Sequence, residues 1–221
     1  YSTAAVAQNT ISLLLNIATM THIHSRYVST GHWTDPTDHA LVSVPMFELA
    51  GKTIGLIGCG DIGSAVGRIA AAFGMRVLAY RRHPDPSAGA YIRFVALDAL
   101  YAQSDIVSLH CPLTPQTRGM IDRAAIGRMK DGAVLLNTAR GGLLCERDVA
   151  DALDCGKLYM AGLDVLCDEP PAPDSPLARH PRVICTPHIS WMPRETRARL
   201  LRAAADNLLC FLEGNPQNVI V

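Results

Sequence analysis

The sequence lacks an excess of charge of either sign. Its 221 residues include 20 Lys and Arg and 20 Asp and Glu, so the formal net charge at pH 7 is zero. No long run of like charges occurs either. The sequence therefore offers no electrostatic basis for binding nucleic acid or an anionic membrane surface.

Long uninterrupted apolar runs are also missing. The most apolar N-terminal stretch, residues 4–20, is broken by the polar side chains of Gln8, Asn9, Thr10, Ser12 and Asn16. This pattern is typical of a buried or interfacial helix rather than of a signal peptide or a membrane span. The sequence also has no internal repeat and no low-complexity segment, and its length suits one or two domains.

Cysteine pairs with the spacing of a redox or zinc motif are absent. The seven cysteines are scattered, their number is odd, and no two form C-x-x-C. This usage favours reduced thiols in a cytoplasmic protein, with Cys acting mainly as a small core residue. No metal site is expected, because no cysteine lies at zinc spacing from the histidines His22, His24, His32 and His39.

The sequence does contain a strand, a glycine turn, a helix and a second strand within residues 51–82. Residues 53–57 are an apolar run, GCGDIG follows at 58–63, and apolar residues then recur at steps of three and four up to residue 73. Residues 76–80 form a second apolar run. This is half of a dinucleotide-binding fold, so we predict the α/β class, with a Rossmann-type doubly wound parallel sheet and flanking helices.

The glycines of this turn have distinct roles in such a site. Gly58 permits the tight turn, Gly60 lets a pyrophosphate approach the backbone, and Gly63 lets helix and strand pack closely. Asp61 and Ile62 begin the helix, whose free N–H groups and positive dipole end favour phosphates. The flanking elements favour a dinucleotide site over the alternative, a tight turn without a ligand.

A carboxylate is missing where such folds usually carry one. About 20 residues after the glycines, an Asp or Glu ordinarily binds the adenosine ribose, but this sequence has Arg81 and Arg82, followed by His83. Guanidinium groups bind a 2′-phosphate through charge-assisted hydrogen bonds, whereas a carboxylate repels it. We therefore predict a preference for NADP over NAD. The alternative is two solvated arginines on a loop.

Further elements are expected on both sides of this unit. Residues 27–45 form an irregular arm and residues 83–90 a loop, on their Gly and Pro content. Hydrophobic periodicity predicts helices at 3–26, 97–102, 122–129, 146–155 and 194–213, and strands at 105–109, 133–138, 158–165 and 182–186.

Three side chains that follow strands can supply the chemistry of hydride transfer to a ketone. In open α/β sheets ligands bind outside the carboxyl ends of the strands. Arg140 can hold a carboxylate in its planar fork, and His188 can exchange a proton near neutral pH. Glu169 can fix the imidazole tautomer and favour its charged form. Taken singly, each has an ordinary alternative: a surface arginine, a packed histidine and a loop glutamate.

Several motifs together resemble those of the D-isomer-specific 2-hydroxyacid dehydrogenases. They cover almost the whole chain in the family's order: the glycine turn at 51–80, HCPLTPQTRGMID, LLNTARGGL, AGLDVLCDEPP and TPHISW. The resemblance implies that Arg140 binds the substrate and that His188, beside the cofactor, is the acid/base with Glu169 as its partner.

The resemblance also implies contacts with the two ends of the cofactor. Thr138 and Ala139 are expected to line the nicotinamide pocket, with Asp164 near the carboxamide. At the adenine and the phosphates it implies Cys111, Pro112 and Thr117.

Within the family, the closest similarity is to the glycerate dehydrogenase and hydroxypyruvate/glyoxylate reductase branch. It rests on STAAVAQ, on ELAGKT and on Trp191 after PHIS. The implied reaction is NAD(P)H-dependent reduction of a small 2-oxo acid such as hydroxypyruvate or glyoxylate. Phosphoglycerate dehydrogenases share most of these motifs, so the substrate stays open. A corepressor-like, nicotinamide-sensing binding module and a poorly active dehydrogenase fragment are the alternatives.

The same resemblance implies a domain organisation. Most of the family's N-terminal substrate domain is expected to be missing. Residues 1–45 are then a connecting helix and dimerisation arm, 46–190 the dinucleotide-binding domain, and 191–221 a helix returning to the substrate domain. Without that domain, cofactor binding is expected to survive while turnover is poor. We also expect a homodimer through the N-terminal helix and arm.

Overall fold

A parallel sheet of seven strands organises the described part of the protein, in the order β3-β2-β1-β4-β5-β6-β7. The structure is a computed structural model that describes residues 1–34, 45–83 and 89–219. The strand order reverses between β1 and β4, which confirms the predicted doubly wound fold. The strands are β1 (Thr53–Ile57), β2 (Arg76–Tyr80), β3 (Ile92–Phe94), β4 (Ile106–Leu109), β5 (Ala133–Asn137), β6 (Leu158–Leu163) and β7 (Val183–Cys185).

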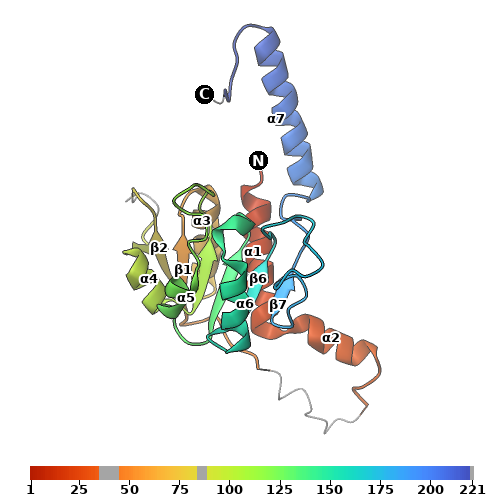
Figure 1. Cartoon of the computed structure of the whole chain (residues 1–221). Coiled ribbons are helices and arrows are strands. Elements are labelled where there is room, and N and C mark those ends of the chain that lie inside the picture. Colours follow the sequence, from red (N-terminus) through yellow and green to blue (C-terminus); the bar gives the residue numbers. More distant parts are fainter. Residues whose placement is uncertain (35–44, 84–88, 220–221) are drawn as a thin grey trace.

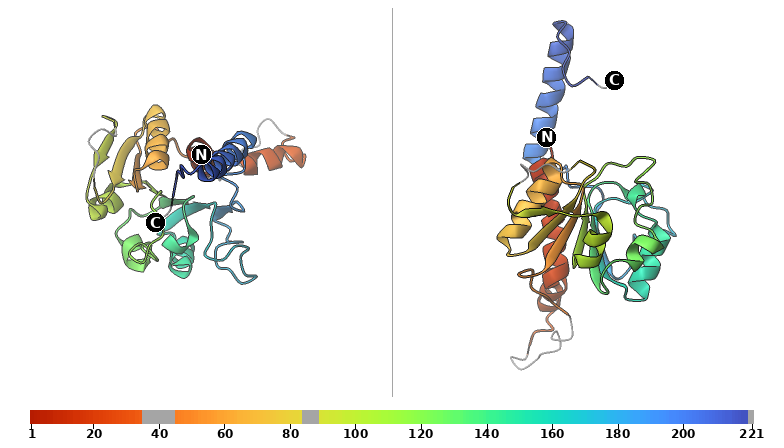
Figure 2. Two further views of the ribbon diagram at one scale, coloured as in Figure 1. Left: turned by 90° about the horizontal axis from the view of Figure 1, so that it is seen from above. Right: turned by 90° about the vertical axis from the view of Figure 1, so that its left-hand side faces the viewer.

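Helices cover both faces of this sheet (Figures 1 and 2). One face carries α1 (Thr3–Thr19) and α3 (Asp61–Ala72), which pack against each other. The opposite face carries α4 (Leu97–Gln103), α5 (Arg123–Gly127) and α6 (Glu146–Asp154). The remaining helices are α2 (Thr21–Ser29), the short 3₁₀ helix η3 (Gly141–Leu143) and α7 (Arg194–Leu212).

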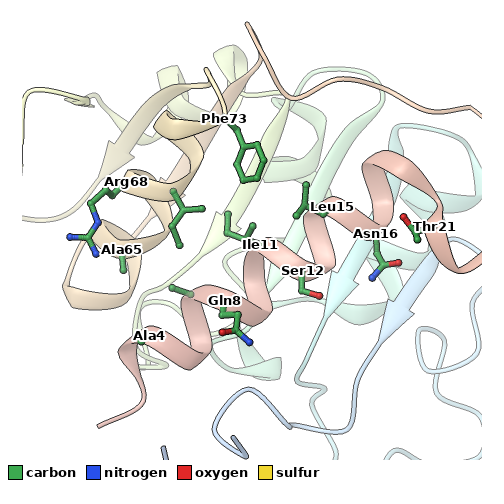
Figure 3. Close-up of a pocket in the computed structure, with 12 residues that line it drawn as sticks. Ala4, Gln8, Ile11, Ser12, Leu15, Asn16, Thr21, Ala65, Arg68 and Phe73 are labelled. Carbon is green, nitrogen blue, oxygen red and sulfur yellow. The ribbon is translucent and has the colours of Figure 1, made fainter. Parts of the chain in front are cut away.

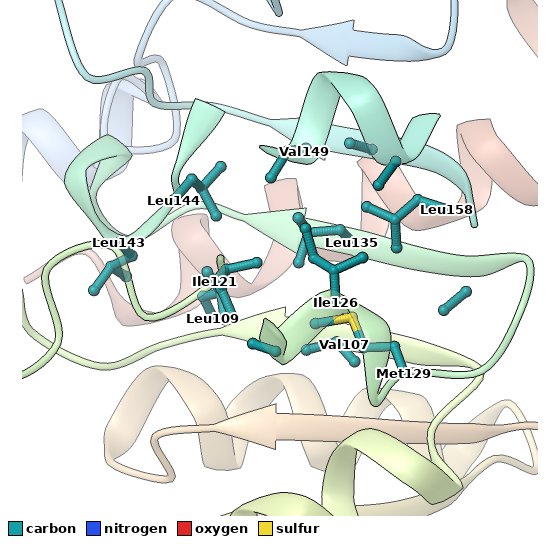
Figure 4. Close-up of a cluster of buried hydrophobic side chains, with 14 of the residues drawn as sticks. Val107, Leu109, Ile121, Ile126, Met129, Leu135, Leu143, Leu144, Val149 and Leu158 are labelled. Carbon is teal, nitrogen blue, oxygen red and sulfur yellow. The ribbon is translucent and has the colours of Figure 1, made fainter. Parts of the chain in front are cut away.

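The strands supply two hydrophobic cores, one on each face. Successive strand side chains point to opposite faces, so Leu56 and Leu136 pack with α1 and α3. Val107 and Leu135 instead pack with α5 and α6, in the cluster that Figure 4 shows. Strands buried on both faces read as nearly continuous apolar runs, which is why β1 and β2 occupy the predicted residues 53–57 and 76–80.

One local prediction was wrong, and one strand was missed. The helix expected over residues 3–26 breaks at Met20, whose φ of 48° is left-handed and separates α1 from α2. Strand β3 was not predicted, because it has only three residues and none of them is fully buried. Part of the expected arm (35–44) and part of the expected loop (84–88) lie outside the described residues.

The N-terminal helix α1 is part of the core around the sheet. Leu14 and Ile17 are fully buried. Gly162 on β6 allows the helix to approach, since a Cβ there would lie 3.1 Å from the Leu13 Cβ. The apolar face of α1 that suggested a subunit interface is therefore largely covered within the chain. The division at residues 45 and 46 stays a prediction.

The C-terminal helix α7 stands away from the sheet in Figure 1 and in the right-hand view of Figure 2. Its one buried residue is Thr196. The Arg199 Nε donates to the Tyr1 carbonyl oxygen at 3.0 Å, which ties the base of α7 to the start of α1. Five of its apolar side chains are 57% to 71% exposed: Leu201, Leu208, Leu209, Phe211 and Leu212.

Two further properties concern the described residues as a set. All seven cysteines are free thiols. Across the ranges that the structure describes, no helix combines the length and the apolar character needed to cross a membrane.

Candidate functional site

The glycine turn lies at the carboxyl end of β1, where the strand order reverses. Gly58 has a φ of +96°, and a Cβ there would lie 2.5 Å from the His110 carbonyl oxygen. A Cβ on Gly63 would lie 2.3 Å from the Gly58 carbonyl oxygen. By contrast, a Cβ on Gly60 would meet no atom within 4 Å. The fold itself thus requires Gly58 and Gly63, whereas the space at Gly60 is open to a ligand.

The first turn of α3 is free to receive an anion. Its N-cap is Gly60, and no side chain caps the helix. The N–H groups at Asp61 and Ile62 are among the first of a helix, which have no partner within the helix itself. Uncapped N–H groups beside an open backbone position suit the phosphates of a dinucleotide.

A cavity of about 670 Å³ extends from the glycine turn to the end of β2. Arg81 and Arg82 line it, and the Arg81 Nη1 donates to the Cys59 carbonyl oxygen at 3.1 Å. On its other side it is lined by the β4 loop residues predicted for the adenine and phosphates: Cys111, Pro112 and Thr117. The Thr117 Oγ1 donates to the Pro112 carbonyl oxygen at 2.7 Å, which folds that loop back on itself.

A second cavity, of about 710 Å³, adjoins the first and shares His110, Cys111 and Pro112 with it. The side chains predicted for nicotinamide and substrate meet here: Thr138, Ala139, Arg140, Asp164 and His188. Ile62, predicted for the phosphates, lines this cavity as well. Residues from six places in the sequence thus line this second cavity, and the two cavities adjoin along the carboxyl ends of the strands.

His188 and Glu169 form a direct pair at this cleft. The His188 Nδ1 lies 2.6 Å from the Glu169 Oε2, and the two side chains are 41% and 38% exposed. The other carboxylate oxygen, Glu169 Oε1, accepts from the Leu166 N–H at 3.2 Å. The pair is accessible to a substrate, and the carboxylate is fixed at both oxygens.

Asp164 anchors the loop that carries His188. Its carboxylate is 1% exposed and accepts from the Thr186 hydroxyl at 2.6 Å and from the Ile189 and Ser190 N–H groups at 2.9 Å. Sequence reasoning assigned Asp164 to the nicotinamide, and that role stays a prediction. The anchoring role was missed, because a loop contact across 22 to 26 residues leaves no local signal.

Arg140 sits on a turn that is held by hydrogen bonds of Asn137 on one side and by a close contact at Gly141 on the other. Buried Asn137 donates from Nδ2 to the Arg140 carbonyl oxygen at 2.9 Å and accepts from the Ala139 N–H at 3.0 Å. The Arg140 Nη1 donates to the Ala139 carbonyl oxygen at 2.6 Å. A Cβ on Gly141 would lie 1.9 Å from the Leu166 carbonyl carbon, so this turn touches the segment leading to Glu169.

Helix α1 reaches the same cleft. The Thr10 hydroxyl lies 2.8 Å from the Thr138 hydroxyl, and the Asn9 Nδ2 donates to the Ser190 Oγ at 2.8 Å. Sequence reasoning treated these polar residues only as interruptions of an apolar run. The sequence did contain a signal for these contacts: both residues lie on an otherwise apolar helix face, where a polar side chain needs a hydrogen-bond partner.

His110 and Cys111 carry perturbed groups at the centre of the cleft. Burial lowers the pKa of the His110 imidazole to about 4 and raises the pKa of the Cys111 thiol, so both are neutral near pH 7. His110 was not among the predicted site residues. Among the described residues, no three His, Cys, Asp or Glu side chains are grouped to hold a metal ion.

Comparisons with known proteins identify the family of this chain. Residues 11–190 match the family model described as "D-isomer specific 2-hydroxyacid dehydrogenase, NAD binding domain". The chain is 46% identical over 221 residues to a hydroxypyruvate reductase of Blautia hydrogenotrophica, and 35% identical over 222 residues to a glycerate dehydrogenase of Methylorubrum extorquens. Each alignment covers 100% of this chain and 69% of the relative. These names match the branch expected from the sequence.

A solved structure is similar over nearly the same extent. The TT0316 protein from Thermus thermophilus superposes with a TM-score of 0.88 at 42% identity, over 98% of this chain and 67% of that one. The chain thus spans about two thirds of the length of the proteins that it matches.

Proposed function

The chain belongs to the D-isomer-specific 2-hydroxyacid dehydrogenase family, and from that premise we propose that it transfers a hydride between a nicotinamide dinucleotide and a small 2-oxo or 2-hydroxy acid such as hydroxypyruvate or glyoxylate. The observation that carries the proposal is the 2.6 Å contact between the His188 Nδ1 and the Glu169 Oε2, with His188 lining a cleft that Arg140 also lines. The hydroxypyruvate reductase and glycerate dehydrogenase relatives support this substrate class.

Each residue of the cleft has a separate role in the reduction. A bound dinucleotide would supply the hydride. Arg140 binds and orients the substrate carboxylate through its planar guanidinium. Glu169 accepts the Nδ1–H of His188 and stabilises the imidazolium, so Nε2 is the nitrogen that gives its proton to the developing alkoxide. The glycine turn and the first N–H groups of α3 hold the pyrophosphate.

The test is His188→Gln, with dinucleotide binding measured separately by fluorescence. The rate of 2-oxo acid reduction is expected to fall about 10²–10⁴-fold, as general acid–base catalysis requires, while dinucleotide affinity is retained. His22→Gln is the matched control, since His22 is exposed on α2. A His188 variant within a few-fold of wild type would exclude the acid/base role. A pure binding module would bind the dinucleotide without reducing any 2-oxo acid.

We further propose that the cofactor is preferentially NADP(H). The support is that Arg81 and Arg82 line the cavity beside the glycine turn, with no carboxylate among the described lining residues. The wild type should then bind NADPH more tightly than NADH, and Arg81→Asp should reverse the order, whereas Arg179→Asp, outside the cleft, should not. Tighter binding of NADH by the wild type would contradict the proposal.

The homodimer expected from the family remains a proposal, and a groove between α1 and α3 supports it (Figure 3). The groove is lined largely by apolar side chains, among them Ile11, Leu15 and Ile69, and Phe73 at its edge is 40% exposed. Phe73→Glu should convert a dimer to a monomer in sedimentation experiments, whereas Leu212→Glu at the far end of α7 should leave the mass unchanged. A wild type that sediments as a monomer would contradict the proposal.

The remaining parts of the organisation are proposed on similar grounds. The exposed apolar side chains of α7 support the assignment of residues 191–221 as a helix that returns to a substrate domain. The seven free thiols support a reducing compartment such as the cytoplasm.

A further inference from the structure

We propose that His110 is a dinucleotide-binding residue that donates a hydrogen bond from Nδ1 to a ribose or phosphate oxygen of the cofactor. The inference rests on the proposed function, because it assigns a new contact within the same cleft. It assigns a role to a residue for which the sequence predicted none.

His110 lies where the two cavities meet. His110 directly follows β4, opposite the glycine turn that follows β1, so it lies where the strand order reverses. Its carbonyl oxygen would lie 2.5 Å from a Cβ on Gly58, and its own Cβ would lie 3.5 Å from a Cβ on Gly63. It is also one of the three residues that line both cavities. The His110 side chain therefore stands at the junction between the arginine end and the nicotinamide end of the cleft.

The contact with Ser108 sets the tautomer of His110. The His110 Nε2 lies 2.9 Å from the hydroxyl of Ser108, which is fully buried. Among the described residues Ser108 has no other side-chain partner. If Nε2 carried the proton, the serine hydrogen would be buried without an acceptor, which is costly. The satisfied arrangement has Ser108 donating to Nε2, and this leaves the imidazole proton on Nδ1.

The His110 Nδ1 is free and accessible. It has no hydrogen-bond partner among the described residues. Among the described residues, two side-chain atoms are fully buried and have no hydrogen-bond partner: His24 Nε2 and Tyr101 OH. His110 Nδ1 is not one of them, so this unpartnered atom is not fully buried. Nδ1 thus reaches the space of the cleft with a donor to offer.

The ring is also neutral. Burial lowers the pKa of His110 to about 4, so near pH 7 it carries one proton and no charge. The charged groups of the cleft lie toward its two ends, with Arg81 and Arg82 at one and Arg140, Asp164 and His188 at the other. A neutral donor at the junction can bind an oxygen without adding a buried charge.

The ligand chemistry at the junction follows from the two ends. With the adenosine beside Arg81 and the nicotinamide beside Thr138, the part of a dinucleotide between them is the ribose–diphosphate. Its polar atoms are oxygens, all of which can accept a hydrogen bond. An Nδ1–H donor is therefore complementary to it, whereas a bare Nδ1 acceptor would repel a phosphate oxygen.

The experiment compares two variants that keep different nitrogen positions. His110→Asn retains an N–H donor near the place of Nδ1, and His110→Gln retains one near the place of Nε2. Dissociation constants for NADPH and NADH are measured by fluorescence titration, and folding is checked by circular dichroism. We expect His110→Asn to stay within about threefold of wild type and His110→Gln to bind about tenfold more weakly, the range of one lost hydrogen bond. Equal effects of the two variants, or none, would overturn the proposal.

A second measurement does not depend on any variant. The ¹⁵N shifts of the imidazoles in the ligand-free wild type distinguish the two tautomers, with the spectrum of His110→Asn assigning the signal. We expect the Nδ1–H form, and a predominant Nε2–H form would overturn the proposal. If the wild type binds the dinucleotide but substitutions of His110 leave the dissociation constant unchanged, the proposed function stands and this inference alone fails. If the wild type binds no dinucleotide, the proposed function fails first.

Discussion

His188 is held by the main chain of Asp164. The His188 N–H donates to the Asp164 carbonyl oxygen at 2.9 Å, and His188 has a φ of 53°, in the left-handed region that non-glycine residues seldom occupy. That conformation costs about 1–2 kcal/mol, so surrounding contacts must impose it. The three hydrogen bonds accepted by the Asp164 carboxylate do so, because they fix residues on both sides of His188.

Asp164→Asn is expected to damage both stability and catalysis. An amide at this site must turn an N–H₂ group toward one of the three donors, leaving buried partners unpaired at a cost of about 1–3 kcal/mol. Denaturant unfolding measures the loss of stability, and the reduction rate should fall because His188 is no longer fixed. The exposed Asp174→Asn is the control. Unchanged stability would show that the anchor is dispensable.

Glu169→Gln is expected to lower the reduction rate while leaving dinucleotide affinity unchanged. Gln can still accept from the His188 Nδ1–H, but it no longer offers a charge to the imidazolium. The loss should therefore be smaller than for His188→Gln, about 10²-fold or less. Steady-state kinetics beside a Glu213→Gln control would check it. A larger loss of reduction rate than for His188→Gln would show that the Glu169 carboxylate contributes to catalysis independently of His188.

Gly60→Ala is expected to weaken dinucleotide binding, whereas Gly63→Ala is expected to destabilise the fold. The Gly63 variant places a methyl group 2.3 Å from the Gly58 carbonyl oxygen and should destabilise the fold by about 1–3 kcal/mol. The Gly60 variant meets no protein atom, so its unfolding midpoint should match the wild type while dinucleotide affinity falls. Full affinity in a folded Gly60→Ala protein would contradict the position assigned to the pyrophosphate.

Asp105 provides a pH-dependent contribution to stability away from the cleft. Burial acts to raise the pKa of its carboxyl, but hydrogen bonds from the Lys130 Nζ and the Thr53 N–H outweigh it, so the pKa lies below its ordinary value. The stabilisation is therefore present at neutral pH and is lost as the pH falls through the lowered pKa.

The corresponding test is Asp105→Asn, followed by urea unfolding from pH 7 to pH 3. We expect a loss of about 1 kcal/mol at pH 7 and convergence with the wild type in acid. A gap that stays constant with pH would show that the pair contributes packing rather than charge.

The sequence predicted what depends on neighbouring residues. Apolar runs located β1 and β2 to the residue, and the glycine spacing located the turn after β1. The family motifs predicted that Arg140 and His188 share one cavity, since strand ends of a parallel sheet meet at one edge.

What the sequence did not predict depends on contacts between distant segments. The bonds from Thr10 to Thr138 and from Asn9 to Ser190 join residues 128 and 181 positions apart. The break at Met20 was missed as well, because a left-handed residue other than glycine gives no compositional signal. Secondary structure is local, whereas the polar network behind the cleft is assembled only by the complete fold.

The two outermost strands, β3 and β7, have three residues each. The unpaired main-chain groups of an edge strand can pair with a strand of another molecule, and edge strands of three residues offer few such groups. The described sheet is therefore a poor template for fibrillar aggregation, and self-association is left to the surfaces of the helices.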